Sequence, residues 1–292
     1  MNMNEAKIVV YFDQLGFSNS VLAKDSGHAA LNEFFENESM LHFGVETENL
    51  INEEIRLKNK NDESKNTFDH VIMFSDSIFL SGVPSISFFT HLASFLGRCW
   101  RRNTSVYWCE FTDADFPFVG REIKKSSPIL FRGGICIGSV SIVKAKTIIN
   151  GKEEVSSFLF GPAYVNSCKI ESQIISKGPR IFIDELSAGK ILEIEDFNSE
   201  VELFFQKIDS QEEFYEFLWP AFYLKNLNSE AEIYDMLIGA INYYKVFKGE
   251  KFEKHYEELI NLFFKSSTAL CNYKKNPELL IKTTNIFKKF KN

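Results

Sequence analysis

The sequence predicts an α+β protein in which an antiparallel-rich sheet is covered by helices mainly on one face. Short runs of β-branched and aromatic residues alternate with longer segments in which apolar residues recur at helical intervals. In chain order the expected elements are β, α, β, β, α, β, followed by one more α and β. The last third of the chain is dominated by helical stripes. These patterns predict a sheet domain followed by a helical extension.

The first half of the chain supplies three of these strands. The run IVVYF, residues 8–12, has the composition of a central strand, and residues 21–58 are compatible with one interrupted helix or two. Residues 70–82 hold two apolar runs separated by a polar turn that contains Asp76, which predicts a hairpin. After Pro84, apolar side chains spaced along one helical face predict a helix that ends in a basic turn.

The second half opens with a strand-like segment, residues 128–143, in which Gly133 and Gly134 are adjacent. Paired glycines in a strand indicate a bulge or the close approach of another backbone or a ligand. A polar hairpin follows, and a Gly-Pro pair then begins a helix expected over residues 162–178. The run RIFIDE, residues 180–185, is expected to be the final strand of the sheet.

We place the boundary between the two regions near residue 195, with one domain over residues 1–195 and a helical extension over residues 196–292. The extension either packs on the sheet domain or forms a dimer contact, and its periodicity favours neither. The terminal lysines, including Lys288, Lys289 and Lys291, predict a frayed and solvated tail.

The composition is that of a globular protein, with 45% hydrophobic and 25% charged residues and thirty phenylalanines. A formal net charge of −7 argues against a general nucleic-acid binder. Five cysteines without metal-type spacing predict free thiols in a reducing compartment. The N-terminus lacks a signal-peptide core, and no apolar run approaches about 20 residues. We therefore expect a cytoplasmic protein that binds neither nucleic acid nor membrane.

Asp13 and Asp76 are the first candidate functional residues. Asp13 ends the first predicted strand within FDQLGFS, where Gly16 permits a tight turn and Ser18 offers a helix cap. A carboxylate beside free backbone N–H groups suits a metal-bound phosphate, although many such junctions carry an aspartate only for capping. In a βαββαβ sheet the strands that carry the two aspartates can be central neighbours, with both carboxylates at one end.

Two carboxylates this close repel each other unless cations lie between them. Ligation by oxygen alone favours magnesium or manganese over zinc, so we expect two Mn²⁺ or Mg²⁺ ions at Asp13 and Asp76. Two such ions can clamp a triphosphate and activate a sugar hydroxyl. The alternative is a pair of unrelated surface aspartates, but both lie in apolar contexts where an unpaired charge is costly.

Four stretches of the chain resemble the catalytic domain of class III nucleotide cyclases. They are FDQLGFS at the first aspartate, FSDSI at the second, RGGICIGSV on the next strand and GPAYVNSCKIES at the start of the last core helix. The likeness runs from about Lys7 to Glu185. It implies a ferredoxin-like βαββαβ core, metal ions on Asp13 and Asp76, and an obligate head-to-tail homodimer with composite active sites. Residues 1–195 are then the catalytic domain.

The departures from that family concern the nucleotide base and the transition state. Purine cyclases carry a base-reading lysine where this chain has Ile72, and their second polar reader falls at Phe158. A pocket without polar partners does not select a purine strongly, because such specificity needs buried polar pairing. The family's transition-state asparagine and arginine fall at Val165 and Lys169. Lys169 keeps the charge of arginine but not its bidentate geometry.

This pattern most resembles the pyrimidine cyclases of the bacterial Pycsar anti-phage systems. The resemblance implies conversion of UTP, or of CTP, to the 3′,5′-cyclic monophosphate with release of diphosphate, which makes a second messenger for antiviral defence. It also implies that Gln14 joins the aspartates in binding metal, and that Lys169 or Arg132 steadies charge at the phosphoryl oxygens. The remaining nucleotide-binding positions are Leu15, Gly16, Phe17, Ser18, Ile72 and Phe158. Tyr11 shares the strand face of Asp13 and either contacts the nucleotide or is an ordinary core tyrosine.

Two alternatives stay open. An adenylate or guanylate cyclase with an unusual base pocket would carry the same two aspartates. A catalytically inactive nucleotide-binding dimer module is favoured by Val165 and Lys169, whereas the retained pair of aspartates argues against it.

Overall fold

The computed structural model describes most of the chain in ten stretches: residues 6–15, 67–74, 77–104, 130–149, 152–173, 178–194, 203–208, 213–225, 231–251 and 253–291. The strands are β1 (Lys7–Gln14), β2 (His70–Phe74), β3 (Ser77–Gly82), β4 (Phe131–Gly138), β5 (Ser141–Ile149), β6 (Lys152–Phe160), β7 (Ile181–Asp184), β8 (Phe205–Lys207) and β9 (Phe214–Phe217). The helices are α4 (Ile86–Thr104), α5 (Pro162–Gln173), α6 (Glu185–Leu192), α8 (Trp219–Leu224), α9 (Ala231–Val246), α10 (Glu253–Lys274) and α11 (Pro277–Lys291). The helical segment expected over residues 21–58 lies outside the described residues.

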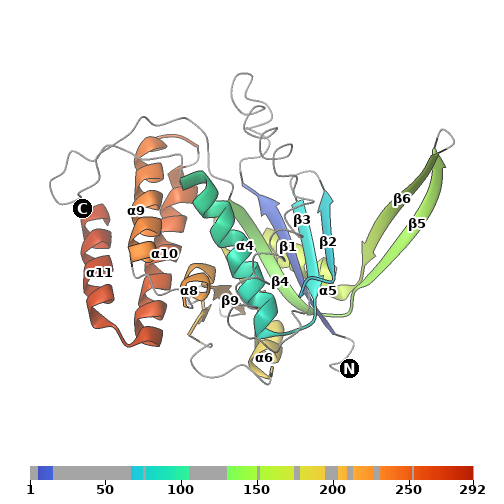
Figure 1. Ribbon diagram of the computed structural model, residues 1–292, viewed down its shortest axis with the longest axis horizontal. Coiled ribbons are helices and arrows are strands. Elements are labelled where there is room, and N and C mark those ends of the chain that lie inside the picture. The colour runs from blue at the N-terminus through green and yellow to red at the C-terminus, as the bar shows by residue number, and fades with distance from the viewer. Residues whose placement is uncertain are drawn as a thin grey trace, which may run out of the picture.

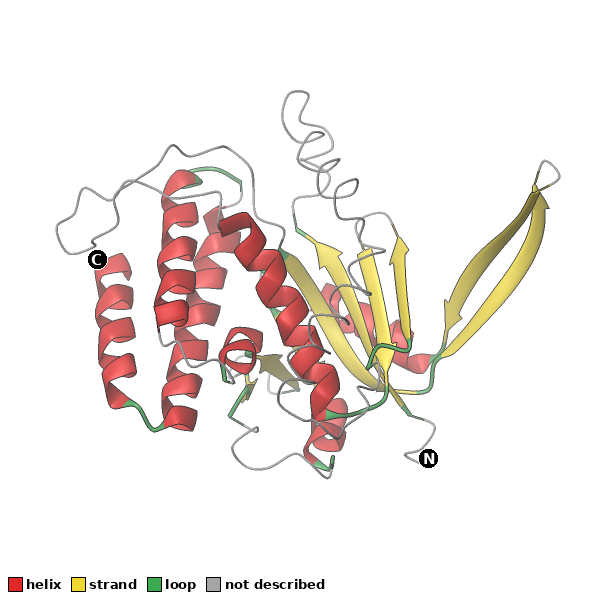
Figure 2. Ribbon diagram, in the orientation of Figure 1, coloured by secondary structure: helices red, strands yellow, loops and turns green. Residues whose placement is uncertain are grey.

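A seven-stranded mixed sheet forms the centre of the protein, in the order β2-β3-β1-β4-β7-β9-β8. β1 pairs antiparallel with β3 and β4, and β4 pairs parallel with β7. The α+β class and the antiparallel-rich sheet are therefore confirmed (Figure 2). The expectation that β7 is the final strand is wrong, since β9 pairs with β7 and β8 pairs with β9.

The segment expected as one strand over residues 128–143 divides in two. β4 ends at Gly138, and β5 turns away to pair with β6 in a separate two-stranded sheet. Figure 1 shows this hairpin projecting from the body of the protein beyond the β2 edge of the main sheet. A two-stranded ribbon has little core of its own.

The two faces of the sheet carry different cores. Along β1, the side chains of Ile8, Val10 and Phe12 join the larger core, which includes α4 and the C-terminal helices. Val9 lies on the opposite face, where it packs with Ala163 and Ile170 of α5. This alternation is the period of two that a strand imposes. Most helices thus lie on one face, as expected, and α5 covers the other.

The C-terminal helices pack onto the larger core and extend it. α8, α9 and α10 contribute fully buried side chains to the same cluster as α4 and the sheet, including Phe222, Leu237 and Phe263. Figure 1 shows α9, α10 and α11 side by side at the end of the protein opposite the hairpin. Because β8 and β9 also lie beyond residue 195, the sheet and its main core both continue past the predicted domain boundary, which stays a prediction.

The expectation of a frayed tail is wrong. α11 continues to Lys291, and Leu279 and Thr283 on its inner face are fully buried. Its lysines stay exposed at Lys288 and Lys289, while Phe287 stacks on Phe264 of α10 with ring centroids 4.1 Å apart. The apolar face holds this helix in place although its outer face is strongly basic.

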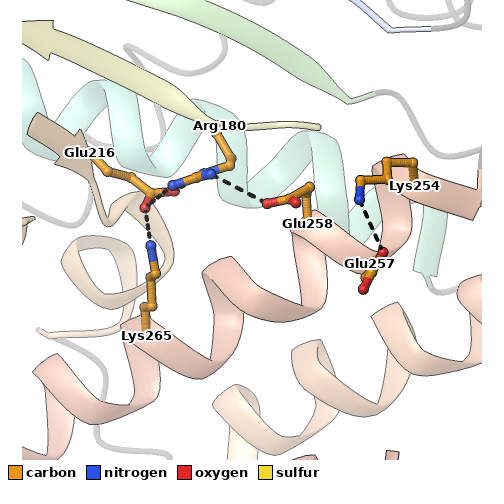
Figure 3. A network of polar contacts seen from close by, with 6 residues as sticks. All are labelled: Arg180, Glu216, Lys254, Glu257, Glu258 and Lys265. Carbon is orange, nitrogen blue, oxygen red and sulfur yellow. Dashed lines mark hydrogen bonds and ion pairs between the residues drawn. The ribbon is translucent and has the colours of Figure 1, made fainter. Parts of the chain in front are cut away.

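A buried ion network fastens α10 to the sheet (Figure 3). Arg180, just before β7, donates two hydrogen bonds to the Glu216 carboxylate of β9. From α10, Lys265 donates to Glu216 at 2.8 Å, and Glu258 accepts from Arg180 at 3.3 Å. Two positive and two negative charges are thereby matched where the Glu216 side chain is only 1% exposed.

None of the helices within the described stretches combines the length and apolar character that a membrane crossing needs.

Candidate active site

Asp13 lies near the end of β1, at the centre of the sheet. It pairs with Ser77 of β3 on one side and with Arg132 of β4 on the other. Its side chain is 27% exposed, so it can reach a ligand. Asp76 lies outside the described residues, but Ser77, which follows it directly in the sequence, is the cross-strand partner of Asp13. The expectation that the strands carrying the two aspartates are neighbours therefore agrees with the register of β1 and β3.

Arg132 binds a carboxylate that the sequence did not reveal as part of the site. Its Nε donates a hydrogen bond to Oε1 of Glu171 on α5, and its Nη2 forms an ion pair with the same oxygen. The same Nη2 lies 3.6 Å from Oδ2 of Asp13, which is an ion pair but longer than a hydrogen bond. The Glu171 side chain is only 9% exposed, against 25% for Arg132. The guanidinium thus bridges a buried carboxylate and the candidate metal ligand.

Glycine allows α5 to lie this close to the sheet. A Cβ added at Gly134 would lie 2.2 Å from the Ser167 carbonyl oxygen and 2.8 Å from Cβ of Ile170. A Cβ at Gly133 would lie 2.5 Å from the Phe12 ring on the other face. The close approach indicated by the paired glycines is therefore confirmed, while β4 keeps an unbroken register with β1 and has no bulge.

Tyr11 shares the sheet face of Asp13 and is held beside it. Its hydroxyl lies 2.8 Å from Oγ of Ser77, within hydrogen-bond distance. Burial, more than the Asp13 charge, raises the pKa of the Tyr11 phenol. Nearby on α5, burial also raises the pKa values of Tyr164 and Cys168. These three groups stay neutral at pH 7, and the Cys168 thiol is a weak nucleophile.

The structure limits which groups of the two residues after Asp13, Gln14 and Leu15, can reach a ligand. Gln14 is 6% exposed and alternates to the opposite face, so only its backbone carbonyl can face a metal at Asp13. The Leu15 N–H donates to the Leu130 carbonyl at 2.8 Å and is therefore already paired within the chain. Gly16, Phe17 and Ser18 lie outside the described residues.

The residues aligned with the base readers lie on β2 and β6. Ile72 is partly buried and packs against the α5-side core, whereas Phe158 is 52% exposed on the projecting hairpin. Neither provides a polar group for a nucleotide base.

Lys169 lies on the exposed face of α5, together with Val165 and Asn166. The buried face of the same helix carries Ala163, Ser167, Ile170 and Glu171. Because α5 covers the sheet face that carries Asp13, Lys169 points away from the Asp13 of its own chain. The structure therefore brings Asp13, Tyr11 and Arg132 together and leaves Lys169 and Phe158 facing outward.

No group of three or more histidine, cysteine or carboxylate side chains able to hold a metal ion occurs within the described stretches. The donors that do occur at the β1 end, a partly exposed carboxylate and backbone carbonyls, are oxygens of the kind that Mg²⁺ and Mn²⁺ prefer.

No family model matches the sequence, and no curated protein matches it. A bacterial light-regulated adenylyl cyclase of known structure aligns with 61% of this chain and 75% of its own, with 11% sequence identity and a TM-score of 0.28. A TM-score this low carries no argument about function. We therefore argue function from the residues of this chain.

Proposed function

We propose that the chain is a homodimeric nucleotide cyclase that converts a pyrimidine nucleoside triphosphate, UTP in preference to CTP, to the 3′,5′-cyclic monophosphate and diphosphate. The observation that carries the proposal is the position of Asp13. This partly exposed carboxylate lies near the end of a central strand and is the cross-strand partner of the residue that follows Asp76. The cyclase-like motifs around both aspartates support the same assignment.

Asp13 and Asp76 would hold two Mg²⁺ or Mn²⁺ ions, with the Gln14 carbonyl as a further oxygen ligand. Bound ions supply charge that clamps the triphosphate and increases the acidity of the 3′-hydroxyl. Tyr11 adds a neutral hydroxyl beside Asp13, where it can contact the nucleotide. The bond between O3′ and the α-phosphorus forms, the bond to diphosphate breaks, and the proton of the 3′-hydroxyl passes to water.

The pyrimidine assignment rests on the absence of polar groups at the two base-reading positions. Ile72 offers only an aliphatic surface, and Phe158 offers an aromatic one. A larger purine gains no hydrogen bond from either, so the usual source of purine selectivity is missing.

A dimer would complete the site. Lys169 is exposed and turned away from its own Asp13, as expected of a group that serves the partner subunit. Exposed apolar side chains on the hairpin and the start of α5 supply a surface for that contact: Val143, Phe158, Phe160 and Val165. Of the two candidate cations, Lys169 would then steady charge on the phosphoryl oxygens, since Arg132 is paired with Glu171.

The test is the replacement of the proposed metal ligands. Asp13→Asn and Asp76→Asn should each lower cyclic nucleotide formation by at least about a thousandfold, because each removes a charge from the metal site. Asp69→Asn is the matched control, since Asp69 is an exposed aspartate just before β2 that pairs with Lys7 at 2.5 Å. It should leave activity unchanged. Full activity in Asp13→Asn would exclude the proposed site.

One specific observation favours the inactive-module alternative, namely the apolar Val165 where the family has an asparagine. Tight binding of a nucleoside triphosphate without turnover, in the presence of Mn²⁺, would identify that alternative.

A further inference from the structure

We infer that Glu171 is a positioning residue that holds the Arg132 guanidinium off the Asp13 carboxylate and so permits a metal ion to bind at Asp13. The inference rests on the proposed function in one respect, the role of Asp13 as a metal ligand. It assigns Glu171 and Arg132 a joint function that neither has in the chemistry proposed above.

The strand register alone would place Arg132 in a direct salt bridge with Asp13. The two residues are Cα partners across antiparallel strands, where opposite charges attract at close range. The structure shows that Arg132 is shared between two carboxylates, and unequally. Its Nε donates a hydrogen bond to Glu171 and its Nη2 pairs closely with the same carboxylate, whereas the ion pair of Nη2 with Asp13 is longer, at 3.6 Å. The close contacts of the guanidinium therefore go to the helix, and the weaker one goes to the neighbouring strand.

Burial explains why Glu171 holds the guanidinium. The Glu171 side chain is 9% exposed, and a carboxylate this poorly hydrated needs a charged, hydrogen-bonded partner. Arg132 provides it, because a guanidinium does not lose its proton in proteins. Asp13, at 27% exposure, keeps a route to solvent and to ligands.

The close packing of α5 on β4 fixes the position of Glu171. Gly134 lets the Ser167 carbonyl approach the strand within a distance that any side chain would prevent. Glu171 follows one turn later on the same buried face of α5. Its carboxylate is thus held above Arg132 by the backbone and not by a flexible loop.

A guanidinium paired fully with Asp13 would compete with a divalent cation for the same oxygens. Neutralising Glu171 releases Arg132 toward Asp13 and strengthens that competition. Removing Arg132 as well abolishes it. Neutralising Glu171 therefore lowers the affinity for the metal, and removing Arg132 raises it. A purely structural role of the pair does not produce such opposite effects.

The experiment measures Mn²⁺ binding directly, by the EPR signal of free Mn²⁺ in titrations of the full chain without nucleotide. Glu171→Gln should weaken binding about ten- to hundredfold, the usual effect of losing a partner behind a metal ligand. Arg132→Met should bind Mn²⁺ at least as tightly as the wild type. The double variant should return to within about threefold of the wild type. Glu185→Gln, which alters an exposed helical glutamate paired with Lys207, is the matched control and should have no effect.

Each outcome decides the inference. Unchanged affinity in Glu171→Gln, or a double variant as weak as Glu171→Gln, overturns it. If Glu171→Gln does not fold by circular dichroism, Arg132→Met decides, because weaker Mn²⁺ binding by a folded Arg132→Met protein also overturns it. Asp13→Asn separates the two proposals. If Asp13→Asn binds Mn²⁺ like the wild type, the proposed metal site is wrong. If Asp13→Asn loses Mn²⁺ binding while Glu171→Gln keeps it, the metal site stands and only the role of Glu171 is rejected.

Discussion

Glu216 is the residue whose charge should matter most for stability outside the candidate site. Its side chain is 1% exposed, accepts two hydrogen bonds from Arg180 and binds Lys265 at 2.8 Å. Glu216→Gln keeps the shape of the side chain and removes its charge. Arg180, whose side chain is 10% exposed, then keeps the Glu258 carboxylate at 3.3 Å but loses the charge of its nearer partner. The buried guanidinium is left undercompensated.

The expected loss follows from the desolvation of Arg180. Breaking a buried ion pair by removing one partner costs about 3–5 kcal/mol. Lys265 is 36% exposed and can turn to water, and Glu258 still faces Arg180, so the lower end of the range applies, about 3 kcal/mol. For a domain of this size that loss lowers Tm by roughly 6–12 °C.

Urea unfolding followed by circular dichroism measures the change in the free energy of unfolding. The matched control lies in the same view of α10 (Figure 3), where Lys254 pairs with Glu257 at 3.7 Å and is 60% exposed. Lys254→Gln should change stability by less than about 0.5 kcal/mol, because exposed pairs contribute little. A Glu216→Gln protein within about 1 kcal/mol of the wild type would refute the reasoning about burial.

Three further predictions concern other parts of the chain. Burial lowers the pKa of Lys225 from 10.5 to about 8. The charged lysine therefore lowers the free energy of unfolding, and this loss disappears as pH rises from about 8 to 10.5. Lys225→Met should therefore stabilise the protein at pH 7 by about 1–2 kcal/mol, after allowance for partial exposure and for the contact of the Lys225 ammonium with the Phe222 ring, 3.6 Å from its centroid. The gain should be much smaller at pH 10 in urea unfolding. Gly134→Ala should destabilise by about 1–3 kcal/mol through its clash with α5, whereas Gly189→Ala, with nothing within 4 Å of the added Cβ, should slightly raise Tm. Mixing inactive Asp13→Asn and Lys169→Met proteins should restore about a quarter of wild-type activity. Half of the dimers are then mixed, and each mixed dimer has one intact composite site out of two. No recovery after subunit exchange would mean that both residues act in the site of one chain.

The sheet around Asp13 could be predicted from the sequence because its signals are local. Short apolar runs marked β1, β3 and β4. The turn residues after each run indicated where the strand ends. The paired glycines correctly indicated that another backbone lies against β4, although not which one. The Gly-Pro pair at residues 161 and 162 likewise marked the start of α5.

Glu171 could not be identified as part of the site in the same way. Its partner lies 39 residues earlier in the chain, and only the tertiary packing of α5 on β4 joins them. One signal was present: Ala163, Ser167 and Ile170 define the buried face of the helix, and Glu171 falls on it. A buried carboxylate requires a cation, and Arg132 on the strand beneath was the nearest candidate.

Three elements of the C-terminal third, β8, β9 and α11, were missed, and the reasons differ. β8 and β9 have three and four residues, too few for a period of two to stand out, and their pairing with each other and with β7 is what defines them. α11 did have a sequence signal at its start. Asn276 accepts hydrogen bonds from the backbone N–H groups of Glu278 and Leu279, and Pro277 occupies the first turn. The lysine-rich composition concealed this cap and the apolar face behind it.

The most direct test of the proposed function is a competition among the four nucleoside triphosphates. The full chain is incubated with Mn²⁺ and equal concentrations of ATP, GTP, CTP and UTP, and the four cyclic mononucleotides are quantified by mass spectrometry. Cyclic UMP, or cyclic CMP, should predominate, and Asp13→Asn should form neither. Formation of purine products alone would contradict the reading of Ile72 and Phe158, and the absence of every cyclic product would contradict the cyclase assignment itself.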